Sequence, residues 1–237
     1  MAGMKEIGFD SGDESIGAKG NRLKLKEGES YRLSFVWFKG IDEGKPQLDE
    51  PTPKFIACNR FYVPGVGYFV DNGPEFARLA GVPSKTVIGT VVCQWPTDRT
   101  GNLDKGRFQS GEFAMKAWTI SQDKYKLIKQ ISSEFPLGKH DITVACTDTQ
   151  FQKITATPCR ESLFRKMYES GKAGTILTSA IEVISELPRD LAQDLTLDQV
   201  REKMGKGGTG PMGGGSGARA SNTSPEFDNM LDDILTK

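Results

Sequence analysis

The side chains of this chain with the clearest binding chemistry are lysines, arginines and aromatics that interleave along strand-like stretches. Four places stand out: Lys54, Arg60 and Tyr62 in one run, Trp95 beside a loop with Arg99, Arg107 and Phe108, then Lys116 and Trp118, and finally Phe151 and Lys153. Single-stranded nucleic acid is bound by cations along its phosphates and by aromatic rings on which its bases stack. Each place alone is as consistent with a core aromatic beside a solvated cation, but the set of four favours nucleic-acid binding.

Enzyme chemistry finds little support in the same sequence. His140 is the only histidine, and no GxSxG or GxxxxGK[ST] motif occurs. The four cysteines contain no CxxC pair, so we predict no zinc, no other metal, no cofactor and no catalytic residues. With no signal peptide evident, the cysteines are expected to be reduced thiols of a cytoplasmic protein. A nuclease with carboxylates assembled from distant residues stays an alternative.

Strands must position most of the candidate side chains. Alternating or β-branched runs predict strands in 31–38, 54–63, 85–95, 112–120, 141–147 and 151–159, and 66–70 is a candidate to pair back on 54–63. In 54–63 the alternation places Arg60 and Tyr62 on one face and Phe61 and Val63 on the other. Gly89 inside a long strand predicts a bulge or bend.

Helices are predicted between and after these strands. Spacing and end signals favour helices in 74–81, 121–135, 160–171 and 196–204, with Ser121 and Thr196 as N-caps. The stretch 174–188 fits helix or strand, and Pro188 is expected to close it. Segment 96–111 is expected to be a turn-rich loop. The fold class is therefore mainly β within the α+β class, a small barrel with a few peripheral helices.

Charge and composition divide the chain into four segments. The formal net charge of the 237 residues is zero, but residues 54–172 hold 17 Lys and Arg against 11 Asp and Glu. A basic middle between acidic ends suggests a polyanionic partner, and no apolar run is long enough for a membrane span. We expect a flexible arm at 1–20, one domain at 21–204, a glycine-rich linker at 205–225 and a disordered acidic peptide at 226–237.

The last of these segments is amphipathic. Apolar side chains recur at helical spacing with aspartates between them, in the set Phe227, Met230, Leu231, Asp232, Asp233, Ile234 and Leu235. A peptide this short is not stable as an isolated helix and would order on a partner. We therefore expect it to dock on another protein, in preference to a merely solubilising tail.

From Asn21 to about Tyr168 the chain resembles the single-stranded DNA-binding proteins of tailed phages, the helix-destabilising type with an OB-fold core. Three features carry the resemblance. The first is the LKLKEGESYRLSF lead into the first strand, and the second is the block in which AWTI runs into SQDKYKLIKQI and then into two strands at 138–143 and 151–155. The third is the glycine-rich linker before an acidic, hydrophobic C-terminal peptide. The resemblance implies an OB-type barrel whose cleft binds single-stranded DNA without sequence preference. It also implies an acidic tail that recruits replication and recombination partners and competes with DNA for the cleft.

Two departures from the family pattern qualify this expectation. The closely spaced cysteines and histidine of a zinc module are missing, and residues 1–20 carry only Lys5 and Lys19 against four acids. The second departure puts cooperative binding in doubt, and the oligomeric state stays open. The expected function is non-enzymatic protection of single-stranded DNA in phage replication, recombination and repair, in the host cytoplasm if the protein is phage-encoded. An RNA-binding or transcription-associated OB module and an adaptor for an acidic protein remain the alternatives.

Overall fold

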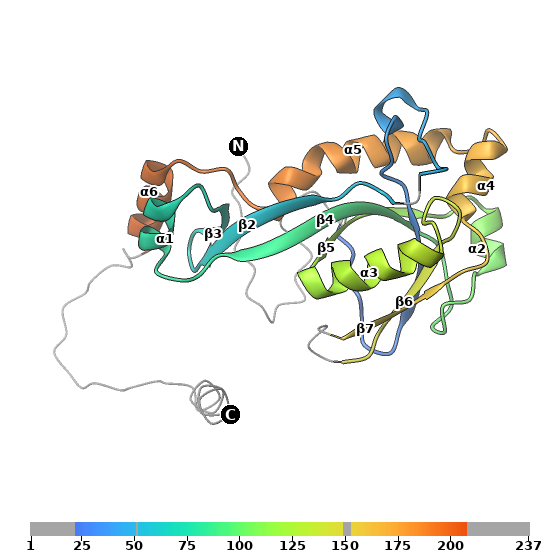
Figure 1. Cartoon of the computed structure of the whole chain (residues 1–237), viewed down its shortest axis with the longest axis horizontal. Coiled ribbons are helices and arrows are strands. Elements are labelled where there is room, and N and C mark those ends of the chain that lie inside the picture. Colours follow the sequence, from blue (N-terminus) through green and yellow to red (C-terminus); the bar gives the residue numbers. More distant parts are fainter. Residues whose placement is uncertain (1–21, 51, 149–152, 208–237) are drawn as a thin grey trace. The chain divides into compact units, whose positions relative to one another are not determined.

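A computed structural model describes residues 22–50, 52–148 and 153–207 (Figure 1). The elements are β1 (Ser30–Phe35), η1 (Ile41–Glu43), β2 (Ile56–Val63), β3 (Gly67–Val70), α1 (Pro74–Ala80), β4 (Lys85–Gln94), α2 (Lys105–Gln109), β5 (Ala114–Ile120), α3 (Gln122–Glu134), β6 (Ile142–Cys146), β7 (Ile154–Pro158), α4 (Leu163–Glu169), α5 (Gly174–Leu191) and α6 (Leu197–Gly207). The mainly antiparallel sheet and its helices confirm the α+β class.

The seven strands form one open sheet, so the expectation of a closed barrel is wrong. Their order is β3-β2-β4-β1-β6-β7, with β5 on the other edge of β4. Within the described ranges, β5 pairs with no other named strand and β7 pairs only with β6. The segment before β1 bonds to β5 and to β6, where the Leu23 amide donates to Ala117 (2.9 Å) and the Gly28 amide donates to Cys146 (3.2 Å).

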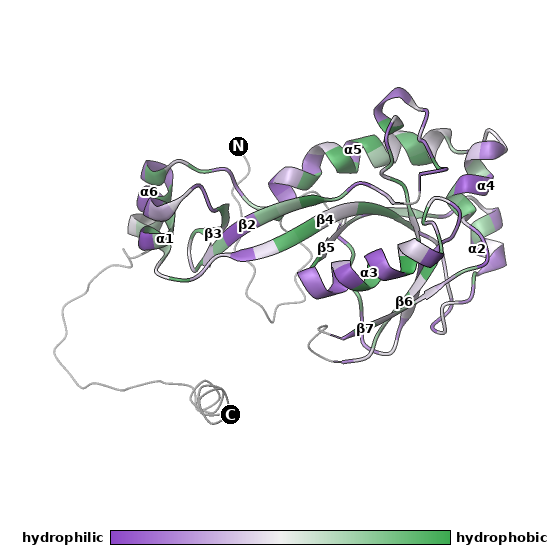
Figure 2. Cartoon of the chain, in the orientation of Figure 1, coloured by the Kyte–Doolittle hydropathy of each residue, from purple (hydrophilic) through white to green (hydrophobic). Residues whose placement is uncertain are grey.

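Helices cover the two faces of the sheet differently (Figure 1). Helix α5 packs on β4 and β5, while α3 packs on β4 and β7 from the other side. Figure 2 shows apolar and polar segments alternating along α5, as an amphipathic helix requires. Its apolar side chains Ile176, Ala180, Val183 and Leu187 are buried against the sheet.

Most predicted boundaries agree with the structure. Ser121 caps α3, and Thr196 and Gln199 form a reciprocal capping box at the start of α6, with backbone bonds of 3.3 and 2.9 Å. Segment 96–111 contains the short helix α2, which Asp104 caps through the Arg107 amide. Helix α5 runs one turn beyond Pro188, where the missing N–H removes a single helix bond near the end.

Gly89 marks a close contact and not a bulge. It pairs regularly with Ile56 on one side and Thr119 on the other. A Cβ atom at this position would lie 3.0 Å from the methyl groups of Leu191 and 3.1 Å from Leu187. The absence of a side chain therefore lets α5 approach the sheet.

Candidate nucleic-acid interface

The β2–β3 hairpin exposes two tyrosines side by side. Tyr62 and Tyr68 are cross-strand partners, and their ring centroids lie 4.9 Å apart. The two residues are 47% and 36% exposed. Arg60 lies on the same face, with its guanidinium carbon 3.8 Å from the centre of the Tyr68 ring. We call Arg60, Tyr62 and Tyr68 the tyrosine platform.

Strand alternation explains why these rings face solvent. Their sequence neighbours Phe61 and Phe69 point to the opposite face and are buried in a second hydrophobic cluster. That cluster also takes in Phe76 from α1 and Val200 from α6, so the two helices cover this face. Because one face of the hairpin is occupied by core packing, the tyrosines must occupy the other.

Positive charge surrounds the platform. The Arg60 guanidinium donates to the carbonyl of Leu191, at the C-terminal end of α5. Arg22 donates to the carbonyl of Asp190 and also forms an ion pair with its carboxylate (3.6 Å). A helix C-terminus carries partial negative charge, which these cations complement. Burial lowers the pKa of Arg60. Lys85, exposed and opposite Arg60 in the strand register, adds a third cation.

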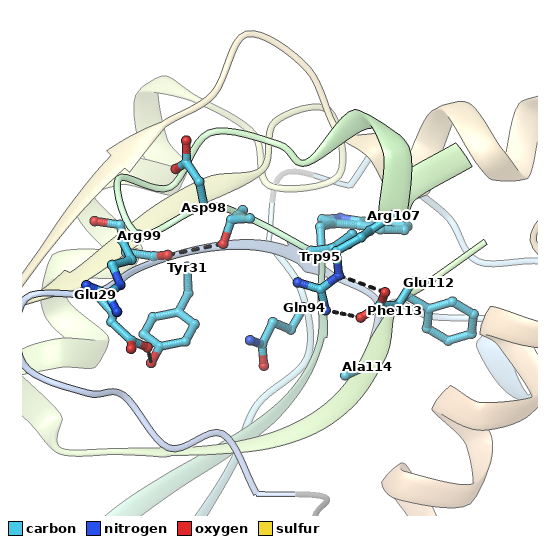
Figure 3. Close-up of a pocket in the computed structure, with 13 residues that line it drawn as sticks. Glu29, Tyr31, Gln94, Trp95, Asp98, Arg99, Arg107, Glu112, Phe113 and Ala114 are labelled. Carbon is cyan, nitrogen blue, oxygen red and sulfur yellow. Dashed lines mark hydrogen bonds and ion pairs between the residues drawn. The ribbon is translucent and has the colours of Figure 1, made fainter. Parts of the chain in front are cut away.

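A second feature is a cavity of about 290 Å³ at the other end of β4 (Figure 3). It is formed by Glu29 and the start of β1, by the end of β4, by residues 95–99 and 112–114, and by Arg107 of α2. Figure 3 shows Tyr31 and Gln94 in its centre, with Arg99 on one side and the Arg107–Glu112 ion pair on the other. Strand register places Gln94 opposite Leu33 and Ala114, on the sheet face away from α5.

Each of the three carboxylates of this cavity has an internal donor. The Tyr31 hydroxyl donates to Glu29 (2.7 Å), and burial together with this bond raises the pKa of Tyr31 to about 12. The Arg107 Nε donates to Glu112 (2.8 Å), which lowers the pKa of that carboxyl. Asp98 accepts from the amide and hydroxyl of Thr100 (2.9 and 2.7 Å). Its pKa is lowered by these bonds.

Gln94 and Arg99 are long polar side chains of the cavity that have no internal partner among the described residues. Within the described part of the chain, neither the Gln94 carboxamide nor the Arg99 guanidinium has a hydrogen-bonding partner or an ion pair. Gln94 is half-buried and Arg99 is exposed. The cavity therefore offers one amide inside and one cation at its edge.

The structure brings only some of the predicted residues into these two places. Arg60 and Tyr62 meet in the platform, while Lys54 is exposed just before β2. Arg99 and Arg107 line the cavity, and Phe108 packs edge-on against Trp95 beside it, with ring centroids 5.4 Å apart.

The prediction that Trp95 and Trp118 offer free stacking faces is wrong. Trp95 is 2% exposed and its Nε1 donates to Ser34 (2.7 Å). Trp118 is 3% exposed and packs beside Phe35 in the main core. Both indoles are the largest side chains available to fill the space between the sheet and its helices.

Of the remaining candidates, Lys116 and Lys153 lie within the described residues and the others lie outside them. Lys116 is half-buried on β5, and burial lowers its pKa. Lys153 is exposed, and its amide donates to the Asp148 carboxylate (3.1 Å). Phe151 and the docking set Phe227, Met230, Leu231, Asp232, Asp233, Ile234 and Leu235 lie outside the described residues.

Sequence reasoning missed Tyr68, Tyr31 and Gln94. The signal for Tyr68 was present, because 66–70 was expected to pair back on the strand that carries Tyr62. Pairing alone would have placed the two rings together. For Gln94 no local signal exists, since Tyr31 and Arg107, which line the cavity with it, come from other parts of the chain.

A buried polar network holds the strands beneath the cavity. Asp141, fully buried, accepts from the Arg32 Nε (2.9 Å), from Ser34 and from the Leu163 amide (3.1 Å). Burial raises the pKa of Asp141. The network joins β1 to the start of β6 and to α4, so it is structural.

No group of three or more metal-binding side chains gathers among the described residues. In those same ranges, no helix is both long and apolar enough to cross a bilayer. Comparison with known proteins found no matching family model, no matching curated protein and no matching solved structure.

Proposed function

We propose that this protein binds single-stranded DNA largely without sequence preference and protects it during phage-type replication, recombination and repair. The observation that carries the proposal is the tyrosine platform. The two exposed rings offer stacking surfaces, and the nearby cations Arg60 and Lys85 offer phosphate contacts, which are the two components that single-strand binding needs. A duplex offers no free base faces to such a platform.

The strand connectivity supports an OB-type core, which is part of the proposal. Strand β1 pairs with both β4 and β6, β4 carries β5, β6 carries β7, and α3 connects β5 to β6. OB cores are five-stranded and partly open, and many bind oligonucleotides. On this reading, the hairpin that carries the platform is an extension inserted between the first two core strands.

The C-terminal peptide completes the proposal. Residues 226–237 would dock replication or recombination proteins through the apolar side chains named above. The support is their helical spacing and the acidic residues between them.

The test is a titration of fluorescently labelled oligo(dT) followed by anisotropy, with a duplex and an RNA strand of equal length as competitors. Tryptophan quenching would be a poor readout, because Trp95 and Trp118 are buried. We expect single-stranded DNA to bind in preference to duplex, with an affinity that falls as salt rises. Stronger competition by RNA would reassign the protein to RNA, and binding of neither would leave the protein-adaptor hypothesis.

A further inference from the structure

We propose that the cavity at the end of β4 takes one unstacked nucleobase that carries an exocyclic amino group, adenine best of all, with its phosphate at Arg99. This inference deepens the proposed function, on which the nature of the ligand rests. It adds a base preference at one position to binding that is otherwise indifferent to sequence.

The size of the cavity fits a single nucleotide unit. Ligand pockets span roughly 300–1,000 Å³, and this one, at about 290 Å³, lies at the lower end. Its walls include the flat rings of Tyr31 and Phe113, together with Pro96. Such walls suit a planar body such as a single base.

The charges of the cavity select a neutral base with donors over an anion inside. The lining holds the carboxylates Glu29, Asp98 and Glu112 against the guanidiniums Arg99 and Arg107. A phosphate placed among these carboxylates would be repelled, even though each already has a donor. An amino group is favoured there, because a carboxylate oxygen has lone pairs to accept further hydrogen bonds.

Gln94 supplies the recognition. Its unpartnered carboxamide has one acceptor and two donors, which match the N6 amino group and N7 of adenine in a bidentate pair. Thymine has no exocyclic amino group and would leave the acceptors of the cavity unpaired. Arg99, exposed at the edge, is placed to pair with the phosphate outside.

The geometry makes this site independent of the tyrosine platform. The nine residue steps from Lys85 to Gln94 correspond to about 30 Å of strand. The register also places the platform on the α5 face and Gln94 on the opposite face. Variants of one site therefore leave the other intact.

The experiment compares dAMP with dTMP by NMR titration, and oligo(dT) with the same strand carrying one central dA by anisotropy. We expect a preference for adenine of about five-fold or more in at least one comparison. Gln94→Ala should abolish it, while Gln130→Ala, an exposed glutamine on α3, should not. Arg99→Ala should reduce the affinity for dAMP to that for deoxyadenosine.

The two comparisons identify the source of the ligand. Preference in the strand shows that the base belongs to bound DNA, whereas preference only among mononucleotides points to a free nucleotide. Gln94→Glu gives a second check, because a carboxylate pairs with the cytosine amino group and should shift the preference from adenine to cytosine.

Equal binding of adenine and thymine in both comparisons, or a preference that survives Gln94→Ala in a folded protein, would overturn the inference. If oligo(dT) binds but shows no base preference, the cavity is not a base-binding site, and the proposed function is still supported. If dAMP binds in preference to dTMP but no oligonucleotide binds, the cavity is a nucleotide site, and the proposed function is wrong.

Discussion

Replacing the two platform tyrosines with alanine is the most direct perturbation of the proposed DNA site. Tyr62 and Tyr68 are the exposed rings of the β2–β3 hairpin, and neither contributes to the hydrophobic cluster beneath it. Truncation should therefore change binding far more than folding.

The magnitude follows from what each ring provides. Stacking of a base on an aromatic ring contributes about 1–3 kcal/mol by alanine substitution, which is about 5- to 150-fold in Kd. The rings lie 4.9 Å apart and form one surface, so the double variant should lose less than the sum of the single variants. Tyr68→Ala also removes the ring under Arg60, which frees that cation without removing its charge.

Anisotropy at several salt concentrations separates stacking from charge. Tyr62→Ala with Tyr68→Ala should raise Kd at every salt concentration and leave the slope of log K against log salt unchanged. Arg60→Gln should reduce the slope by about 0.7, the value for one phosphate contact on a single strand. Tyr62→Phe keeps a ring and should bind normally, and Phe135→Ala, which removes an aromatic of similar exposure at the end of α3, is the matched control.

One result would refute the reasoning. If the double variant unfolds at the wild-type temperature and binds oligo(dT) within two-fold of wild type, the platform is not the stacking site. A loss of affinity equal to that of Phe135→Ala would lead to the same conclusion.

Three further predictions concern the scaffold. Asp141→Ala leaves the Arg32 guanidinium without its buried partner and should cost about 3–5 kcal/mol; a fall in melting temperature of about 6–20 °C checks it. Burial and the bond to Glu29 raise the pKa of Tyr31 to about 12, above its unfolded value near 10, so the free energy of unfolding should fall as the pH rises between those values. Urea unfolding at several pH values should show a shallower fall for Tyr31→Phe. Gly89→Val would push side-chain methyl groups into Leu191 and should lower the free energy of unfolding by about 1–3 kcal/mol. Gly174→Ala is the control, because a Cβ atom there meets open space, and it should be neutral or slightly stabilising in the same urea assay.

The sequence was a good guide wherever one local pattern decided the outcome. The alternation of 54–63 correctly placed Tyr62 and Phe61 on opposite faces, because a strand with one buried face has only one acceptable register. The caps at Ser121 and Thr196 were found from residue type and spacing alone.

Burial of the tryptophans was beyond local reasoning. Trp118 shares a strand face with Lys116, which makes that face look half-polar in the sequence, yet the structure packs Trp118 beside Phe35 in the core. The open sheet was also unpredictable, since closure depends on whether β5 meets β7, and these strands are separated by a helix and another strand. Long-range packing decides both outcomes.

The end of α5 determines which part of the sheet stays available for a ligand. Over β4 and β5 the helix buries the outer face, and Gly89 lets it lie close. It stops at Leu191, whose carbonyl is bonded by Arg60, so the same face becomes exposed where the hairpin begins. On the reverse side α1 and α6 close the hairpin. The tyrosines are therefore exposed because the covering helix ends at Leu191, and in the proposed function the cations beside this helix end would contact phosphates.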